Sequence, residues 1–157
     1  MLLVTAAACS DRASGAQATA PSGTITVDDA HGGLGLERFH YTGRWEHLRA
    51  MHDGRAGGTS TRSPFLGSSF AIAFRGRRFR VYGVTGPNGG HGVLALDRNV
   101  KTAILDFYSP RKRTRVLLYS SPRLNAALHS VSVIVDGTRD RASRGTYVNV
   151  DSVQIDP

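Results

Sequence analysis

Residues 69–83 of the chain read SFAIAFRGRRFRVYG, and this stretch decides the fold. Phe70, Ile72 and Phe74 occupy every second position, and a small residue stands between each pair. Side chains on a β-strand alternate between two faces, so this pattern places one face in a core and the other in water. A second alternating run follows a glycine and begins at Arg78. The stretch therefore predicts two strands joined by a tight turn and paired antiparallel as a hairpin.

The same pattern recurs along most of the chain. Short runs rich in Val, Ile, Phe and Tyr alternate with clusters of Gly, Pro, Asn, Asp and Ser, which is typical of all-β proteins. We expect a second hairpin turn at residues 97–99 and no helix. The expected strands are residues 24–29, 38–48, 57–62, 68–75, 78–84, 92–97, 101–108, 115–120, 129–135 and 146–155.

The last expected strand changes phase along its length. Val148 and Val150 share one parity, whereas Val153 and Ile155 share the other. An unbroken strand would expose one of these pairs. A bulge that begins near Asp151 would bring all four side chains inward and would also re-aim the aspartate carboxylate.

The composition describes a small, strongly basic domain. The chain has 157 residues, of which 40% are hydrophobic and 20% charged, enough for one packed core. Its formal net charge is +8, and Lys101 and Lys112 are the only lysines among its 20 basic residues. This balance indicates an anionic partner, which could be nucleic acid, a cell-wall polymer or an acidic polysaccharide. Arginine-rich codon composition is the alternative interpretation.

The N-terminus resembles a bacterial lipoprotein signal. An apolar run over residues 1–8 ends in three alanines immediately before Cys9, the only cysteine, and a Ser, Ala, Gln, Thr and Pro-rich stretch follows. The resemblance implies that residues 1–9 are part of a signal, that Cys9 carries lipid, and that the protein is exported, either as a lipoprotein of the cell envelope or as a secreted protein. Residues 10–23 then form a flexible linker, and residues 24–157 form the domain. A frayed N-terminus with an incidental cysteine is the alternative.

The order of motifs in the domain resembles the galactose-binding-like modules of glycoside hydrolases, carbohydrate esterases and surface proteins. That resemblance implies an antiparallel β-sandwich of jelly-roll topology and a non-catalytic, carbohydrate-binding role. Such modules also stiffen catalytic domains or pack against partner proteins, and in the similar esterases a hydrolase domain follows. The matching motifs are residues 39–45 (FHYTGRW), 67–70 (GSSF), 74–76 (FRG), 81–83 (VYG), 94–97 (LALD), 124, 128–131 (LHSV) and 150–153 (VDSV).

Three aromatic residues are candidates for stacking on a sugar. Tyr41 and Trp45 offer flat faces, although the only tryptophan of a sandwich is often part of the core. Tyr82 lies on the opposite parity to the apolar residues of its strand, and Arg78 and Arg80 share its face. This exposed aromatic beside two guanidinium groups favours an acidic glycan as the ligand.

A glycine-rich loop, residues 86–92, supplies a candidate rim for a binding site. Asn88 and His91 can form directional hydrogen bonds to hydroxyl groups, and the glycines allow close approach. A flexible turn with incidental polar residues is the alternative. The histidines have no metal-ligand spacing, and His129 shares the parity of inward valines, so we expect it to be hydrogen-bonded to the backbone.

Asp28, Asp29 and Asp151 lie on the first and last expected strands. The family resemblance places these strands side by side and implies a structural calcium near them, because carboxylate oxygens suit that ion. Solvated carboxylates that offset nearby arginines are the alternative. We expect no other cofactor.

The leading hypothesis is a non-catalytic module that binds carbohydrate, with a preference for acidic polysaccharide, at the cell envelope. A structural or partner-binding lipoprotein is the first alternative, and an accessory domain that lacks its catalytic half is the second. No Gly-x-Ser-x-Gly elbow supports a hydrolase. The few aromatics beside the basic clusters, together with the export signal, argue against nucleic acid.

Overall fold

A computed structural model describes residues 23–49, 51–99 and 101–157 of the chain. These residues form two antiparallel sheets in a β-sandwich of jelly-roll type, so the expected fold class is confirmed. Among them, no helix is long and apolar enough to cross a membrane. The expected signal with Cys9, and the expected linker apart from Gly23, lie outside the described residues.

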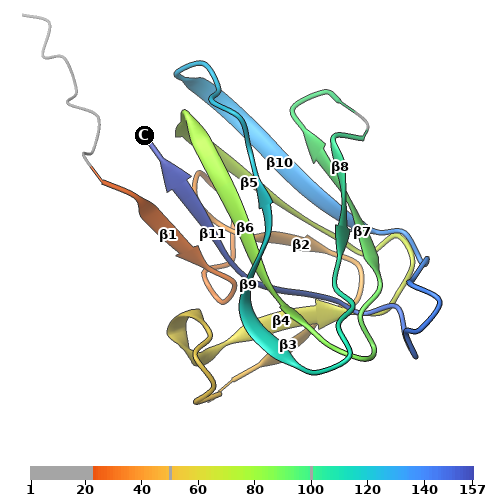
Figure 1. The fold of residues 1–157 in the computed structure, drawn as a ribbon. Helices are drawn as coiled ribbons and strands as arrows, with labels where there is room; N and C mark the ends of the chain where they lie inside the picture. The colour runs from red at the N-terminus through yellow and green to blue at the C-terminus, as the bar shows by residue number, and fades with distance from the viewer. Residues whose placement is uncertain (1–22, 50, 100) are drawn as a thin grey trace, which may run out of the picture.

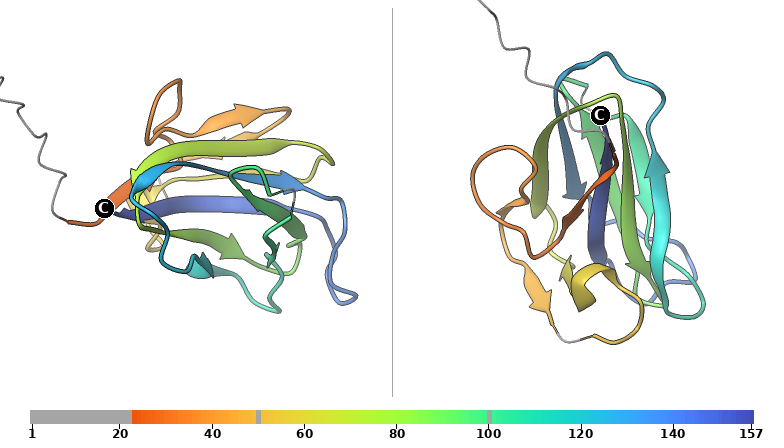
Figure 2. Two further views of the ribbon diagram at one scale, coloured as in Figure 1. Left: turned by 90° about the horizontal axis from the view of Figure 1, so that it is seen from above. Right: turned by 90° about the vertical axis from the view of Figure 1, so that its left-hand side faces the viewer.

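The described strands form two layers (Figures 1 and 2). One sheet has the order β3-β4-β11-β6-β9, with β1 also paired to β11, and is named here the β6 sheet. The other has the order β2-β5-β10-β7-β8 and is named the β10 sheet. The strands are β1 (Ile25–Asp28), β2 (His40–Thr42), β3 (Glu46–Leu48), β4 (Ser60–Ser63), β5 (Ser69–Gly76), β6 (Arg78–Thr85), β7 (His91–Leu96), β8 (Ala103–Asp106), β9 (Arg113–Ser120), β10 (Ala127–Val135) and β11 (Val148–Asp156); η1 (Ala56–Gly58) is a short 3-10 turn.

The hairpin predicted for residues 69–83 is wrong. β5 pairs with β2 and β10, whereas β6 pairs with β11 and β9, so the two strands belong to different sheets. Phe74 and Phe79 instead meet across the core, with ring centroids 5.4 Å apart. The alternating pattern indicates which face is buried, but it does not indicate the partner strand, and stacking the two apolar faces buries both.

Two other predictions about turns and strands have opposite outcomes. β7 and β8 pair as the expected hairpin, and Asp97 at their turn adopts a positive φ of 55°. The single strand expected over residues 38–48 is wrong, because β2 and β3 lie in different sheets. The chain changes sheet after Gly43, whose φ of 86° an ordinary side chain rarely adopts.

The bulge predicted in the last strand is confirmed. The register between β11 and β6 shifts between Val150 and Ser152, and all four apolar residues flanking the shift are fully buried. The first part of β11 pairs with β4 and the second part with β1, also as an antiparallel neighbour. Asp151 therefore lies, fully buried, at the junction of β1, β4 and β11.

Candidate functional site

An open groove of about 400 Å³ lies at the end of the β6 sheet where β6 finishes. The end of β6 and the following turn form one wall. Residues from the end of β3, the β3–β4 connection, β4, the β8–β9 connection, and β11 with the segment before it form the rest. Its polar lining includes Arg55, Arg62, Asn88, Lys112, Tyr147 and Asn149. Because these residues come from five separate segments, the groove exists only in the folded chain.

Arg62 and Tyr147 form a flat pair in the groove. The guanidinium carbon of Arg62 lies 4.9 Å from the centre of the Tyr147 ring. The Nε of Arg62 donates to a carboxylate oxygen of Glu46 at 2.7 Å, which fixes the plane of the guanidinium group. A guanidinium held in this way keeps further N–H donors for a carboxylate or hydroxyl acceptor.

Lys112 is the most accessible cation of the groove. Its Nζ lies 2.7 Å from one carboxylate oxygen of Asp53, and the Nε of Arg55 lies 3.1 Å from the other. The hydrogen bond from Lys112 holds the pKa of Asp53 below its usual value. The side chain of Arg55 is only 2% exposed, whereas that of Lys112 is 55% exposed, so of these two partners of Asp53 only Lys112 can reach a ligand.

Asn149 contributes an unsatisfied acceptor. Its Oδ1 is buried and has no hydrogen-bond partner in the described part of the chain. An unpaired buried acceptor costs about 1 to 3 kcal/mol. Because this oxygen is covered in the free protein, a hydroxyl or N–H donor of a ligand could satisfy it only after the Asn149 side chain rotates toward the groove, and Asn88, exposed on the same groove, offers a second amide.

The glycine-rich loop is packed rather than open. A Cβ on Gly89 would overlap the carbonyl oxygen of Phe107. The Ser143 hydroxyl donates to the Gly89 carbonyl at 2.6 Å, and the Tyr147 amide donates to the Asn88 carbonyl at 3.0 Å. These contacts favour a shaped rim over a flexible turn. Asn88 lines the groove, whereas His91 faces Thr138, with Nδ1 2.9 Å from its hydroxyl oxygen.

Tyr41 and Trp45 lie away from the groove. The Trp45 indole N–H donates to the Thr42 carbonyl at 2.9 Å, and its ring packs against Tyr41 and Phe70. The Tyr41 hydroxyl donates to the Asp29 carbonyl at 2.8 Å, and burial raises its pKa well above the ordinary value. Both rings are therefore held by contacts within the domain.

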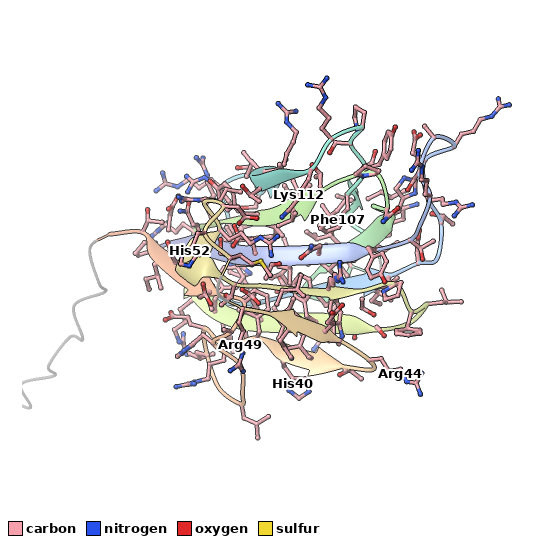
Figure 3. All side chains as sticks on the ribbon, turned by 90° about the horizontal axis from the view of Figure 1, so that it is seen from below. His40, Arg44, Arg49, His52, Phe107 and Lys112 are labelled. Carbon is pink, nitrogen blue, oxygen red and sulfur yellow. The ribbon has the colours of Figure 1, made fainter. Side chains whose placement is uncertain are left out.

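A second hollow of about 430 Å³ lies near Tyr41, lined in part by His40, His47 and Arg49. In Figure 3, His40 and Arg49 lie on the opposite side of β11 from Lys112. The Nδ1 of His47 lies 2.7 Å from the Thr61 hydroxyl oxygen, so this polar group is used within the fold. The groove, which keeps an unsatisfied acceptor and an exposed cation, is the stronger candidate.

Arg78, Arg80 and Tyr82 share the outer face of β6, as expected, but they lie outside the groove lining. Arg80 is engaged by Asp156, with N–O distances of 2.7 and 3.2 Å. Tyr82 is half-buried, and Arg78 is exposed.

The expected acidic group assembles at the junction of β1, β4 and β11; Asp28, Asp29 and Asp151 are named here the acidic cluster. The Ala56 amide donates to Asp151 at 2.8 Å. Burial, reinforced by the charges of Asp29 and Asp28, raises the pKa of Asp151 to about 6. Burial also raises the pKa of Asp29, whose oxygens accept hydrogen bonds from Thr59 and Thr61.

The acidic cluster retains two buried oxygens, Asp28 Oδ2 and Asp151 Oδ2, that have no hydrogen-bond partner among the described residues. Across the same residues, no group of three or more His, Cys, Asp or Glu side chains is arranged to hold a metal ion. A cation at this position would therefore be bound by two carboxylates together with neutral oxygens. The unpaired oxygens of Asp28 and Asp151 can supply the two carboxylate ligands.

His129 lies where the strand pattern placed it. It is buried, and its Nε2 lies 2.9 Å from the Asn125 carbonyl oxygen, which confirms the expected backbone hydrogen bond. Its Nδ1 lies 3.0 Å from a carboxylate oxygen of Asp97. The contacts of this histidine thus stabilise the start of β10.

Sequence reasoning named Asn88 but missed most of the groove. Lys112 stands in a basic cluster after Pro110, which was one usable signal. Asn149 is a polar residue between two inward valines, which was another. No local pattern marks Arg62 or Tyr147, because their contact joins β4 to the segment before β11.

The fold is similar to that of solved β-sandwich structures, some of which are carbohydrate-binding modules. A GH26-CBM35 β-(1,4)-mannanase from Podospora anserina matches with a TM-score of 0.58 and 14% identity over 87% of this chain and 28% of that one. The CBM36-1 domain of a multidomain xylanase from the hindgut metagenome of Trinervitermes trinervoides matches with a TM-score of 0.50 and 12% identity, covering 86% of this chain and 98% of that domain.

A family two carbohydrate esterase from Cellvibrio japonicus also matches, with a TM-score of 0.50 and 19% identity over 85% of this chain and 32% of the esterase. The chain thus spans about a third of the esterase and less of the mannanase. No protein-family model matches the sequence, and no curated protein does. At these identities the likeness shows the fold alone.

Proposed function

We propose that this chain is a non-catalytic carbohydrate-binding module and that its groove binds acidic glycan. The observation that carries the proposal is the combination of Arg62 stacked on Tyr147, exposed Lys112 and the unsatisfied carbonyl of Asn149 in one groove. Sugar recognition uses such flat surfaces together with a few directional polar groups. Two cations beside an acceptor suit a uronic-acid residue, because the cations can bind its carboxylate and the acceptor can bind one of its hydroxyl groups.

The fold comparison supports the carbohydrate part of this proposal. The matched proteins include a mannanase with a CBM35 module and a CBM36 domain of a xylanase. The charge balance of +8 supports the acidic preference, because a ligand that carries carboxylates would be attracted over the whole surface.

Isothermal titration calorimetry with tri-galacturonate and xylotriose tests the proposal. We expect tri-galacturonate to bind and xylotriose to bind more weakly. Asn149→Ala should weaken both, because it removes a hydroxyl acceptor, whereas Lys112→Gln should weaken only the acidic ligand, by up to about fivefold for an exposed ion pair. Arg98→Gln, which removes an exposed charge from the β7–β8 turn, is the control. Equal binding of both sugars, or no binding at millimolar concentration, would overturn the proposal.

We also propose that the acidic cluster holds a calcium ion, with Asp28 and Asp151 as its carboxylate ligands. The ion would satisfy their two unpaired oxygens and offset the buried like charges. Its contribution would be structural, since the β3–β4 connection is hydrogen-bonded to the same carboxylates.

We further propose that Cys9 carries lipid and anchors the module at the cell envelope. The small residues before this cysteine motivate the proposal. Metabolic labelling with a fatty-acid analogue, in a strain that expresses the gene from its natural start, should label wild type and not Cys9→Ser. An unlabelled wild type would contradict it.

A further inference from the structure

A second basic site lies at the other end of β6. A hollow of about 220 Å³ is lined by Arg77, Arg78 and Arg123, named here the distal arginine cluster, together with Asp156 and Pro157. Arg77 and Arg78 stand where the chain enters β6, and Arg123 stands on the connection from β9 to β10. In Figure 1 this end of β6 lies beside the C-terminus, away from the turn that closes the groove.

The distal arginine cluster has a large excess of positive charge. Asp156, the carboxylate in its lining, is already held by Arg80 and by the Thr24 hydroxyl. These hydrogen bonds, the one from Thr24 foremost, lower the pKa of Asp156. Its carboxylate is therefore ionised, but it is already bound to Arg80 and Thr24 and does not pair with the cluster arginines. Among the described residues, the guanidinium groups of the three cluster arginines make no hydrogen bond or ion pair. They therefore remain free to bind an external anion.

The backbone fixes the spacing of this cluster. The amide of Arg77 donates to the Asp156 carbonyl at 2.8 Å, and the carbonyl of Arg77 accepts from the Leu124 amide at 2.7 Å. The two segments that carry the arginines and the C-terminal end of β11 are thus tied to one another. The backbone therefore holds the three arginines in one place, although each exposed side chain still loses conformational entropy when it binds a ligand.

β6 connects the distal arginine cluster to the groove. Arg78 begins the strand and Thr85, which lines the groove, ends it, so the two sites lie about 25 Å apart along eight residues of strand. Arg80 and Tyr82 point outward between them, on the same face of the sheet. The exposed Arg115 of β9 lies near enough to Asp151 to oppose the rise in the pKa of that carboxyl group. It stands between Arg113 and Val116, which pair with Thr85 and Gly83, so it extends the positive face toward the groove.

From this arrangement we infer that one acidic polysaccharide chain runs along the outer face of β6 and contacts both the groove and the distal arginine cluster. The inference rests on the proposed function, because it takes the acidic glycan bound in the groove to be part of a longer polymer that also reaches the distal arginine cluster. Linked contacts make the second binding event intramolecular, so a chain long enough to span both sites binds more tightly than a short one. The ligand is therefore recognised by its length as well as by its carboxylates.

Calorimetry with galacturonic-acid oligomers of increasing length tests this inference. We expect trimers to bind wild type and Arg77→Gln/Arg123→Gln equally. Oligomers that span both sites should bind wild type at least tenfold more tightly than trimers do, and the double variant should lose that gain. Arg44→Gln/Arg98→Gln removes the same charge elsewhere and should keep the gain. Arg77→Lys/Arg123→Lys should keep part of it, and thermal unfolding checks that each variant is folded.

The outcomes separate the inference from the proposed function. Trimer binding without a gain for longer oligomers, or a gain that survives in Arg77→Gln/Arg123→Gln, would overturn the inference and leave the groove proposal standing. An equal loss in the Arg44→Gln/Arg98→Gln control would also overturn it, because net charge alone would explain the gain. If trimers fail to bind while polymer binding still depends on Arg77 and Arg123, the groove proposal falls and the distal contact is upheld.

Discussion

The acidic cluster and the groove both use the connection between β3 and β4, but the acidic cluster gathers carboxylates in the interior, whereas the groove presents cations at the surface. On one side of this connection, Ala56 and Thr59 form hydrogen bonds with carboxylates that lie close together in the interior. On the other side, Asp53 pairs with Lys112 at the surface. Buried like charges cost folding free energy, whereas exposed cations remain available to a ligand. Changes in the acidic cluster should therefore alter stability first, and changes in the groove should alter binding first.

The largest expected effect is that of calcium on stability. An ion that binds only the folded state raises the free energy of unfolding by about 3 kcal/mol at a hundredfold excess over its Kd. Differential scanning calorimetry in millimolar calcium and in EDTA should show this as a rise in Tm for wild type. Asp28→Asn/Asp151→Asn should show no rise. A wild-type Tm that is indifferent to calcium would contradict the proposed ion.

A glycine in the groove loop gives the next largest effect. Gly89→Ala places a Cβ against the Phe107 carbonyl, and this overpacking should cost about 2 kcal/mol and displace Asn88. The matched control is Gly86→Ala, because its Cβ would meet only the Cα of Lys112, at 3.9 Å. Chemical denaturation should separate the two variants. If Gly89→Ala unfolds like wild type, the loop is not packed as described.

Asp151→Asn tests whether the buried charge of the acidic cluster lowers stability when no calcium is bound. In EDTA and at neutral pH, the substitution removes one of three neighbouring carboxylates and keeps an acceptor for the Ala56 amide. We expect the variant to be more stable than wild type by about 1 to 2 kcal/mol, since burial and like charges disfavour the ionised form. Glycan affinity should change little. Destabilisation in EDTA would show that the wild-type charge is compensated in another way.

The smallest effect concerns His129 and Asp97, an ion pair outside both regions. Burial opposes protonation of His129, but its contacts with Asn125 and Asp97 outweigh this and raise its pKa above 6.5. The pKa of Asp97 is lowered below 3.8, since hydrogen bonds from Ser130 and His129 outweigh its partial burial.

The stability that His129 contributes is therefore present below pH 6.5 and is lost as the pH rises through its folded-state pKa. The contribution of Asp97 is present above pH 3.8 and is lost as the pH falls through its own folded-state pKa. Because Asp97 is 44% exposed, the pair should contribute less than about 1 kcal/mol. Denaturation from pH 4 to 9 should show the difference between wild type and His129→Gln shrinking above pH 7. A constant difference would rule out this linkage.

The sequence predicted local features better than partnerships between distant segments. The phase change around Asp151 was sufficient to locate the bulge, because alternation is a property of one strand. The same alternation misassigned β5 and β6 to one hairpin, since two apolar faces can meet across a core as well as belong to neighbouring strands. The groove was mostly missed for the same reason: Arg62, Lys112 and Tyr147 are far apart in sequence and meet only in the folded chain.

The most direct test of the account is to map where an acidic sugar binds. A titration of isotope-labelled protein with tri-galacturonate, followed by amide chemical shifts, locates the contact without any substitution. We predict that the largest changes fall on Asn88, Lys112 and the segment from Tyr147 to Asn149. Changes centred on His40, Tyr41 and His47 would place the ligand in the other hollow and contradict the assignment of the groove.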